Sequence, residues 1–278
     1  GNLDSLLKEH GVLGICDIDT RYLTKMIRDE GAMMMIASTE ISSKDELAKQ
    51  LASSPRIEDI NYIEQVSTKD SYVHKSGAWD HSIKAYKKAV MSDKKVIVID
   101  FGVKRNILNE LVESGLEVEI VPSTFKAEDL IARFEAKEIG GIFLSNGPGD
   151  PLTLIAEKEQ VQKLVKTDIP IFAICLGHQM LSIAHGYDTY KLKFGQHGGN
   201  HPVANNGVVE ITAQNHNYNV PDNIIEIADV THVNLFDNTI EGVKYKNKEI
   251  FSVQHHPEAS PGPHESKYIF AEFAKIVK

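Results

Sequence analysis

The stretch IFAICLGHQML (residues 171–181) decides the fold, because it places Cys175 between an apolar run and a helical pattern. The apolar run predicts a buried strand, and the residues from Leu176 onward predict a helix. A sharp turn at such a corner lifts a side chain clear of the sheet, and a helix N-terminus favours thiolate over thiol. Cys175 is therefore either an activated nucleophile or a small buried apolar residue, since free cysteine often packs in cores.

The surrounding sequence repeats this alternation of strand and helix. KKVIVIDFG (94–102) predicts a strand, and KRNILNELVESG (104–115) predicts a helix that ends at a glycine. Such repeats predict an α/β fold with a mostly parallel central sheet flanked by helices. Sites in these sheets form at the carboxyl ends of the strands, where Cys175, SNGPGDP (145–151) and QHH (254–256) would fall.

The chain divides into three predicted parts. Residues 1–66 predict a partial, smaller α/β domain, with a helix in 17–31, a strand at MMMIA (33–37) and a helix after the capping box SKDE (43–46). Residues 67–93 have no sustained apolar period and are predicted to be a linker. Residues 94–278 form the main domain, which becomes strand-rich after Tyr187 and closes with a helix.

Composition excludes several classes of function. The formal net charge is −9, which disfavours binding to nucleic acid or to an anionic membrane surface. No apolar run approaches the roughly 18 residues that a membrane span needs. Two cysteines in 278 residues indicate no disulfide framework, so we expect a cytoplasmic, reducing location.

A base for Cys175 follows the last predicted strand, in QHHPE (254–258). A thiol needs a base that ionises it, and the base needs a group that fixes its tautomer. His256 and Glu258 suit these roles. His255 is the alternative base, but the Pro-Glu pair follows His256.

Two other types of site are considered and rejected. HGGNH (197–201) is rich in histidine, yet the chain has no H-E-x-x-H and no paired cysteines, so no metal site is predicted. His185 and His216 are expected to be hydrogen-bonded scaffold. GPGDP (147–151) lacks the lysine and the spacing of a P-loop. It predicts either a tight turn or a place where backbone N–H groups approach a substrate carbonyl.

Six motifs in fixed order resemble a known family: FGVKRNIL (101–108), LSNGPGDP (144–151), ICLGHQ (174–179), KFGQHGGNHPV (193–203), TAQNH (212–216) and HPEASPGPHE (256–265). They resemble the triad-type (class I) glutamine amidotransferases and, within them, the carbamoyl phosphate synthetase small subunits. DIDTRYLTKMIRDEGAM (17–33) resembles the end of those subunits' N-terminal domain. The chain starts at GNLDS without a methionine, so we expect it to be N-terminally truncated.

The resemblance implies roles for individual residues. Cys175 matches the nucleophile, His256 the base and Glu258 its orienting partner. Further positions match residues that bind glutamine. Gly147, Gly149 and Leu176 match positions whose backbone lines the glutamine site and the oxyanion hole, and Gln179 matches a side chain that holds the substrate. Contacts made largely through backbone are implied for Asn215, Asn217 and Tyr218, and contact with the α-carboxylate is implied for Lys104. Three residues depart from the family pattern, namely His255, Asn217 and Gln196. Asn217 replaces a glycine and is expected to keep a glycine-like turn.

The resemblance also implies the reaction. L-glutamine is hydrolysed through a cysteinyl thioester to glutamate and ammonia, which passes to the carbamoyl phosphate synthetase large subunit. That partner makes carbamoyl phosphate for arginine and pyrimidine biosynthesis. This chain has no ATP motif, so no cofactor is expected on it, and ATP, bicarbonate and magnesium are expected on the large subunit.

Two rival functions remain open. The chain could be a non-catalytic regulatory or assembly module that keeps the fold without the activity. It could also be a γ-glutamyl hydrolase or cysteine peptidase, although GGNHPV (198–203) weighs against this.

Overall fold

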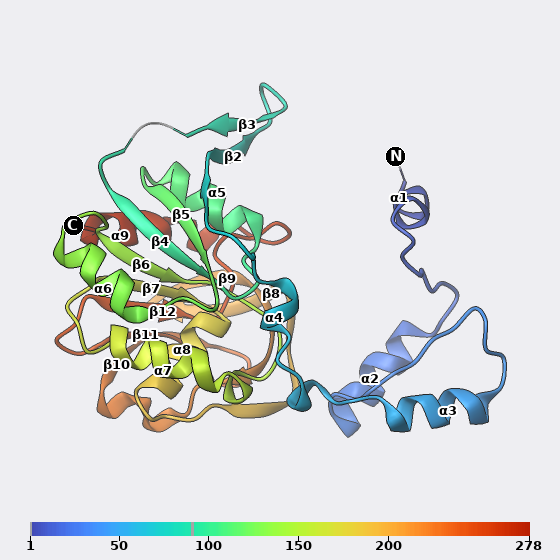
Figure 1. The fold of residues 1–278 in the computed structure, drawn as a ribbon. Helices are drawn as coiled ribbons and strands as arrows, with labels where there is room; N and C mark the ends of the chain where they lie inside the picture. The colour runs from blue at the N-terminus through green and yellow to red at the C-terminus, as the bar shows by residue number, and fades with distance from the viewer. Residues whose placement is uncertain (1, 90–91) are drawn as a thin grey trace. The chain divides into compact units, whose positions relative to one another are not determined.

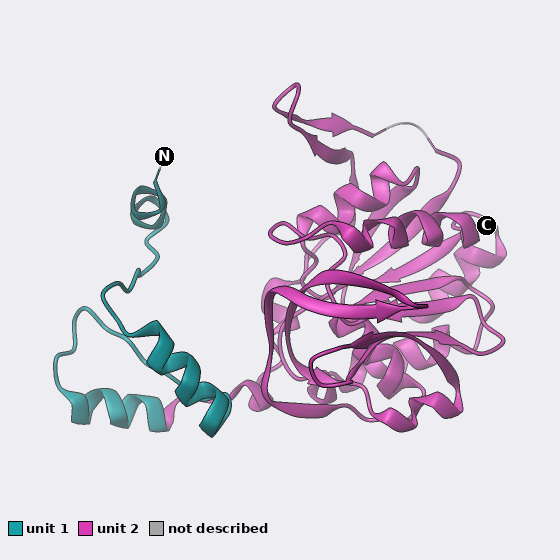
Figure 2. Cartoon of the chain, turned by 180° about the vertical axis from the view of Figure 1, so that it is seen from behind, with its two compact units in different colours: residues 1–52 teal, residues 53–278 magenta. Residues whose placement is uncertain are grey.

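The computed structural model describes residues 2–89 and 92–278 and divides the chain into two compact units, residues 1–52 and 53–278 (Figure 2). The first unit holds α1 (Leu3–Glu9), α2 (Thr20–Glu30) and most of α3 (Lys44–Ser53). The predicted caps of α2 are confirmed, because the Asp19 side chain accepts from the Tyr22 N–H and Gly31 has a φ of 98°. The strand predicted at 33–37 is wrong: no described segment pairs with these residues, and an isolated strand leaves its backbone groups without ladder partners.

The second unit is built on one mixed ten-stranded sheet, with the strand order β1-β5-β4-β6-β7-β12-β11-β10-β8-β9 (Figure 1). Its strands are β1 (Tyr72–His74), β4 (Lys95–Asp100), β5 (Glu117–Pro122), β6 (Gly141–Leu144), β7 (Ile171–Ile174), β8 (Tyr190–Asn205), β9 (Val208–Asn219), β10 (Ala228–Asn234), β11 (Ile240–Tyr245) and β12 (Ile250–Val253). The run β5-β4-β6-β7-β12 is parallel, and the remaining neighbours pair antiparallel. The predicted α/β class is confirmed.

Helices cover both faces of the parallel strands. They are α5 (Arg105–Glu113), α6 (Ala127–Glu135), α7 (Ile155–Leu164), α8 (Leu176–Ala184) and α9 (Ile269–Ile276), and the short helix α4 (Ile63–Val66) precedes the sheet in the chain. Alternate residues of β4 point to opposite faces: Ile97 and Ile99 join the core under α6, α7 and α8, and Val96 and Val98 join the core under α5 and α9. Strands buried on both faces explain the near-continuous apolar runs in the sequence.

The segment predicted to be a linker contains strands. β1 pairs antiparallel with β5 at one end of the sheet, and β2 (Ser76–Asp80) pairs with β3 (Ala85–Lys88) in a separate hairpin. These strands are too short and too exposed to produce a clear apolar period, so composition alone did not reveal them. Residues 90 and 91 of the predicted linker lie outside the described residues.

The carboxyl ends of the parallel strands lie at one edge of the sheet. Four predicted motifs follow β4, β6, β7 and β12 there, which brings together residues far apart in the sequence. No helix of the described residues is both long and apolar enough to cross a membrane.

Candidate active site

Cys175 lies at the turn between β7 and α8, as the sequence predicted. Its backbone has φ 53° and ψ −106°, a conformation that costs a non-glycine residue about 1–3 kcal/mol. The strain is held in place because the Cys175 N–H donates to the Val253 carbonyl at 2.9 Å. The side chain is 5% exposed, and its Sγ lies 3.9 Å from the Asn215 carbonyl oxygen. The cysteine is therefore held at the N-terminus of a helix, with its sulfur facing β9.

The turn is close enough to β6 that only glycine fits at the second helical position. A Cβ on Gly177 would lie 2.3 Å from the Leu144 carbonyl oxygen. The Gly177 N–H donates to the Ser145 carbonyl at 3.0 Å. This bond joins the start of α8 to the loop that carries the GPG glycines, and a Cβ on Gly147 would itself lie 2.2 Å from the Phe101 carbonyl oxygen.

His256 and Glu258 form a buried pair beside the cysteine. His256 Nδ1 lies 2.7 Å from Glu258 Oε1, and the two residues are 6% and 1% exposed. Burial alone would lower the pKa of His256, but the Glu258 carboxylate and the neighbouring Cys175 sulfur outweigh it and raise that pKa. Since Nδ1 faces Glu258, Nε2 is the ring nitrogen left for the thiol.

Lys104 completes this group in a way that the sequence did not predict. Its Nζ lies 2.8 Å from Glu258 Oε1 and donates to the Ala259 carbonyl at 2.7 Å. Burial raises the pKa of Glu258, but His256 and Lys104 outweigh it and lower that pKa, so the carboxylate stays ionised. The family resemblance implies contact of Lys104 with the substrate α-carboxylate, and in the structure its ammonium contacts the carboxylate of Glu258.

Two cavities meet at Cys175. The larger, of about 650 Å³, is lined by His256 and Lys104 among others, and the smaller, of about 190 Å³, by Gly149, Gln179, Asn217 and Tyr218 among others. Five residues line both: Gly147, Pro148, Cys175, His197 and Asn215. Leu176 is 1% exposed, and its side chain packs in the core. Gly149, Gln179, Asn217 and Tyr218 therefore lie around the smaller cavity, and His256 and Lys104 around the larger one. Glu258 and Leu176 line neither cavity.

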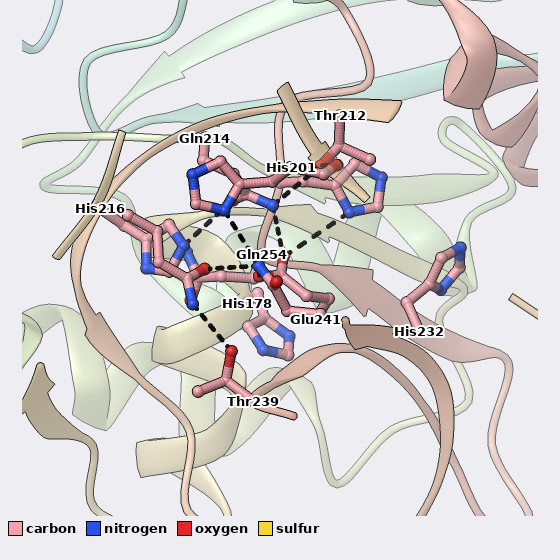
Figure 3. Close-up of polar contacts among 12 residues, drawn as sticks. His178, His201, Thr212, Gln214, His216, His232, Thr239, Glu241 and Gln254 are labelled. Carbon is pink, nitrogen blue, oxygen red and sulfur yellow. Dashed lines mark hydrogen bonds and ion pairs between the residues drawn. The ribbon is translucent and has the colours of Figure 1, made fainter. Parts of the chain in front are cut away.

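His216, which lines the smaller cavity, belongs to a hydrogen-bonded network with Gln214 and Glu241 (Figure 3). Gln179 Nε2 donates to the Tyr218 carbonyl at 2.8 Å and to Gln254 Oε1 at 2.9 Å. His216 bridges the Tyr218 carbonyl at 2.9 Å and Gln214 Oε1 at 3.1 Å. His216 is thus hydrogen-bonded scaffold as predicted, and so is His185, whose Nδ1 bonds the Leu181 carbonyl at 2.7 Å.

Two family models match the chain. One described as glutamine amidotransferase class-I matches residues 97–276, and one described as carbamoyl-phosphate synthase small chain, CPSase domain, matches residues 1–37. The chain is 61% identical over 277 residues to a carbamoyl phosphate synthase small chain of Helicobacter hepaticus, a match that covers 99% of this chain and 73% of the relative.

The chain belongs to the carbamoyl phosphate synthase small chain family. A second relative with that name, from Campylobacter jejuni, is 54% identical over 278 residues, covering 99% of this chain and 75% of the relative. A solved structure from Thermoplasma acidophilum, assigned to GMP synthase, has a TM-score of 0.55 at 23% identity, covering 66% of this chain and 93% of the other. This similarity supports the α/β fold described above. The chain is accordingly the glutamine amidotransferase component of carbamoyl phosphate synthase.

The three departures from the family pattern have distinct surroundings in this small chain. Gln196 is buried, and its Nε2 donates to Asp237 Oδ2 at 2.7 Å and to Thr239 Oγ1 at 2.9 Å. Asn217 lies inside β9 and does not adopt the left-handed turn expected for it, because the strand continues to Asn219. His255 is fully buried and lines neither cavity at Cys175.

His197 is a residue of this small chain that the sequence did not single out. It lines both cavities, and its two ring nitrogens lie 3.1 Å from Asn215 Oδ1 and 3.3 Å from Asn217 Oδ1. The signal in the sequence is the position of His197 within KFGQHGGNHPV (193–203), one of the six motifs that resemble the family.

Proposed function

We propose that this chain hydrolyses glutamine through a thioester on Cys175 and delivers the ammonia to a carbamoyl phosphate synthase large subunit. The observation that carries the proposal is the arrangement of Cys175 at a helix N-terminus next to the buried His256–Glu258 pair. A nucleophile, a base and a group that orients the base are the minimum set for acyl transfer by a thiol.

The first half of the reaction forms the thioester. The Cys175 thiolate attacks Cδ of the glutamine side chain, and the carbonyl oxygen becomes an oxyanion held by backbone N–H groups of Leu176 and Gly147. The imidazolium of His256 then gives its Nε2 proton to the departing nitrogen. Ammonia leaves, and a glutamyl group remains on the sulfur.

The second half regenerates the enzyme. His256, now neutral, removes a proton from water, and the resulting hydroxide attacks the thioester carbonyl. The carbon–sulfur bond breaks, glutamate leaves, and the Cys175 thiolate returns beside a protonated His256. Glu258 keeps Nδ1 bonded throughout, which favours the imidazolium, and Lys104 keeps Glu258 ionised.

The ammonia is useful only if a synthase consumes it. We assign that role to the large subunit, which would bind ATP, magnesium and bicarbonate and make carbamoyl phosphate for arginine and pyrimidine biosynthesis. The support is the name shared by the relatives, small chain of carbamoyl phosphate synthase.

Alkylation by 6-diazo-5-oxonorleucine, a reactive glutamine analogue, tests the proposed nucleophile. The complex of this chain with its large subunit is treated with the analogue, and the modified residue is found by peptide mapping. We expect one adduct on Cys175, blocked by excess glutamine and absent from Cys175→Ala. Cys16→Ala is the matched control, because it removes the other, exposed cysteine and leaves the adduct unchanged. A folded complex that shows no adduct on Cys175 would favour a non-catalytic module.

A further inference from the structure

Three buried residues outside the glutamine site point their polar atoms at one another. They are Glu210 of β9, His232 of β10 and His255, which follows β12. One ligand atom from each lies within 4.8 Å of the other two. Glu210 and His232 are each 6% exposed and His255 is fully buried, so the group lies just beneath the surface.

The inward atoms of all three residues are unsatisfied. Glu210 Oε2, His232 Nε2 and both ring nitrogens of His255 have no hydrogen-bond partner among residues 2–89 and 92–278. Buried polar atoms are almost always hydrogen-bonded, because an unpaired one loses its contacts with water and gains nothing in return. Three neighbouring residues with unpaired buried polar atoms indicate that a ligand binds between them.

The outward atoms of Glu210 and His232 have polar partners. His232 Nδ1 lies 2.8 Å from Thr231 Oγ1, and the Tyr268 hydroxyl donates to Glu210 Oε1 at 2.7 Å. For His255, the Glu241 carboxylate oxygen Oε2 is 3.9 Å from Nδ1, which is beyond hydrogen-bond distance. Metal-binding histidines and carboxylates typically have such partners on their far atoms, which fix the tautomer and the orientation of the ligand atom.

The backbone also makes room for one of the histidines. A Cβ on Gly242 of β11 would lie 2.6 Å from His232 Nδ1, so glycine is what lets the imidazole lie against the neighbouring strand. Figure 3 shows His232 apart from the hydrogen-bonded network around Glu241.

We infer that Glu210, His232 and His255 bind one divalent transition-metal ion. Two imidazoles and one carboxylate are a donor set for Zn²⁺ and related ions, with a fourth position open to water. Tetrahedral ligands at about 2.0–2.1 Å from Zn²⁺ lie roughly 3.4 Å apart, so the three atoms converge by small side-chain rotations. Sequence motifs predicted no metal site, because these ligands come from two different strands and the segment after a third.

The ion would have a structural role. It would tie β9 and β10 to the segment after β12, one residue before His256. None of its three ligands lines either cavity at Cys175. The inference therefore goes beyond the proposed function, and its test needs no activity measurement.

The test is a titration of the chelator-treated full chain with Zn²⁺. Bound metal is measured by competition with a chromophoric chelator, and thermal unfolding is followed in parallel. We expect one equivalent with a Kd below about 1 µM, and a rise in Tm of roughly 5 °C at a hundredfold excess over Kd. X-ray absorption at the zinc edge should show nitrogen and oxygen neighbours and no sulfur.

Two variants test the ligands. Glu210→Gln keeps an acceptor for Tyr268 but loses the carboxylate, and His232→Asn keeps a group beside Thr231 but loses Nε2. Each should weaken Zn²⁺ binding at least tenfold and abolish the rise in Tm. Circular dichroism establishes that both variants fold. His185→Gln and Cys175→Ala are the controls and should still bind one equivalent.

Three results would overturn the inference. The first is a wild-type chain that binds less than a tenth of an equivalent of Zn²⁺. The second is wild-type affinity in folded Glu210→Gln and His232→Asn. The third is a sulfur neighbour in the absorption spectrum, which would place the ion on a cysteine instead.

Discussion

Lys104 Nζ lies 2.8 Å from Glu258 Oε1, the same oxygen that lies 2.7 Å from His256 Nδ1. One carboxylate oxygen therefore faces a fixed cation on one side and the imidazole on the other. Because Glu258 is buried, the ammonium offsets part of the cost of keeping it charged. We therefore propose that Lys104 is a positioning residue whose effect on catalysis passes through Glu258 and His256.

Replacing Lys104 by methionine should lower kcat and leave KM for glutamine nearly unchanged. Without the ammonium the pKa of Glu258 rises, and the carboxylate holds His256 less firmly. We expect kcat to fall roughly tenfold, which corresponds to about 1.4 kcal/mol. Steady-state glutamate release by the complex measures both constants. Exposed Lys166→Met is the control, and a large rise in KM with unchanged kcat would instead support the α-carboxylate role.

Replacing Glu258 by glutamine should lower kcat by at least about a hundredfold. The amide still fills the space, but it carries no charge to stabilise the imidazolium and can hold the wrong tautomer. The 6-diazo-5-oxonorleucine adduct on Cys175 should also form more slowly. Unchanged turnover in this variant would mean that His256 needs no orienting carboxylate.

Replacing Gly177 by alanine should destabilise the fold as well as the site. The new Cβ would overlap the Leu144 carbonyl oxygen, whose strand is fully buried, so we expect a loss of about 3 kcal/mol or more in the free energy of unfolding. Urea unfolding measures it. Gly115→Ala is the control: Gly115 has a φ of 84° and no atom within 4 Å of an added Cβ, so it should cost only about 1 kcal/mol. Equal losses in the two variants would refute the close approach at Gly177.

The ion pair between Arg133 and Glu119 should make stability depend on pH. Arg133 donates to both carboxylate oxygens, at 3.0 and 2.7 Å, and holds the pKa of Glu119 below its usual range despite burial. A lowered carboxyl pKa contributes stability that is present above the unfolded value and is lost as pH falls through the folded one.

Glu119→Gln should therefore cost about 1 kcal/mol at pH 7, and the difference from wild type should shrink below about pH 4. Chemical unfolding across this pH range measures it. Glu128→Gln, at the exposed ion pair with Lys163, should change little at any pH. If the loss in free energy of unfolding caused by Glu119→Gln grew as the pH fell, the predicted direction of the pH dependence would be wrong.

The sequence predicted the parallel part of the fold and the triad, because both depend on local signals. Apolar runs bounded by glycine mark β4, β6 and β7, and the carboxyl ends of parallel strands must share an edge of the sheet. Cys175 and His256 could therefore be placed together before any distance was known.

Other features depend on contacts that no local pattern encodes. Residues 33–37 have the composition of a strand, but pairing needs a partner, and none of the described residues supplies one. The contact between Lys104 and Glu258 joins residues 154 positions apart through side-chain length and direction. The cluster of Glu210, His232 and His255 likewise arises from the order of the strands in the sheet, and the spacing of these residues in the sequence matches no metal-binding motif.

The most direct measurement traps the acyl group on the enzyme. The complex of this chain with its large subunit is mixed with radiolabelled glutamine, quenched in acid within the first turnover and mapped by peptide. The thioester mechanism predicts a glutamyl label on the peptide that carries Cys175, released by hydroxylamine and absent from Cys175→Ala. The thioester mechanism would be contradicted if Cys175→Ala formed glutamate at the wild-type rate. It would also be contradicted if the wild-type enzyme formed glutamate while the peptide that carries Cys175 stayed unlabelled.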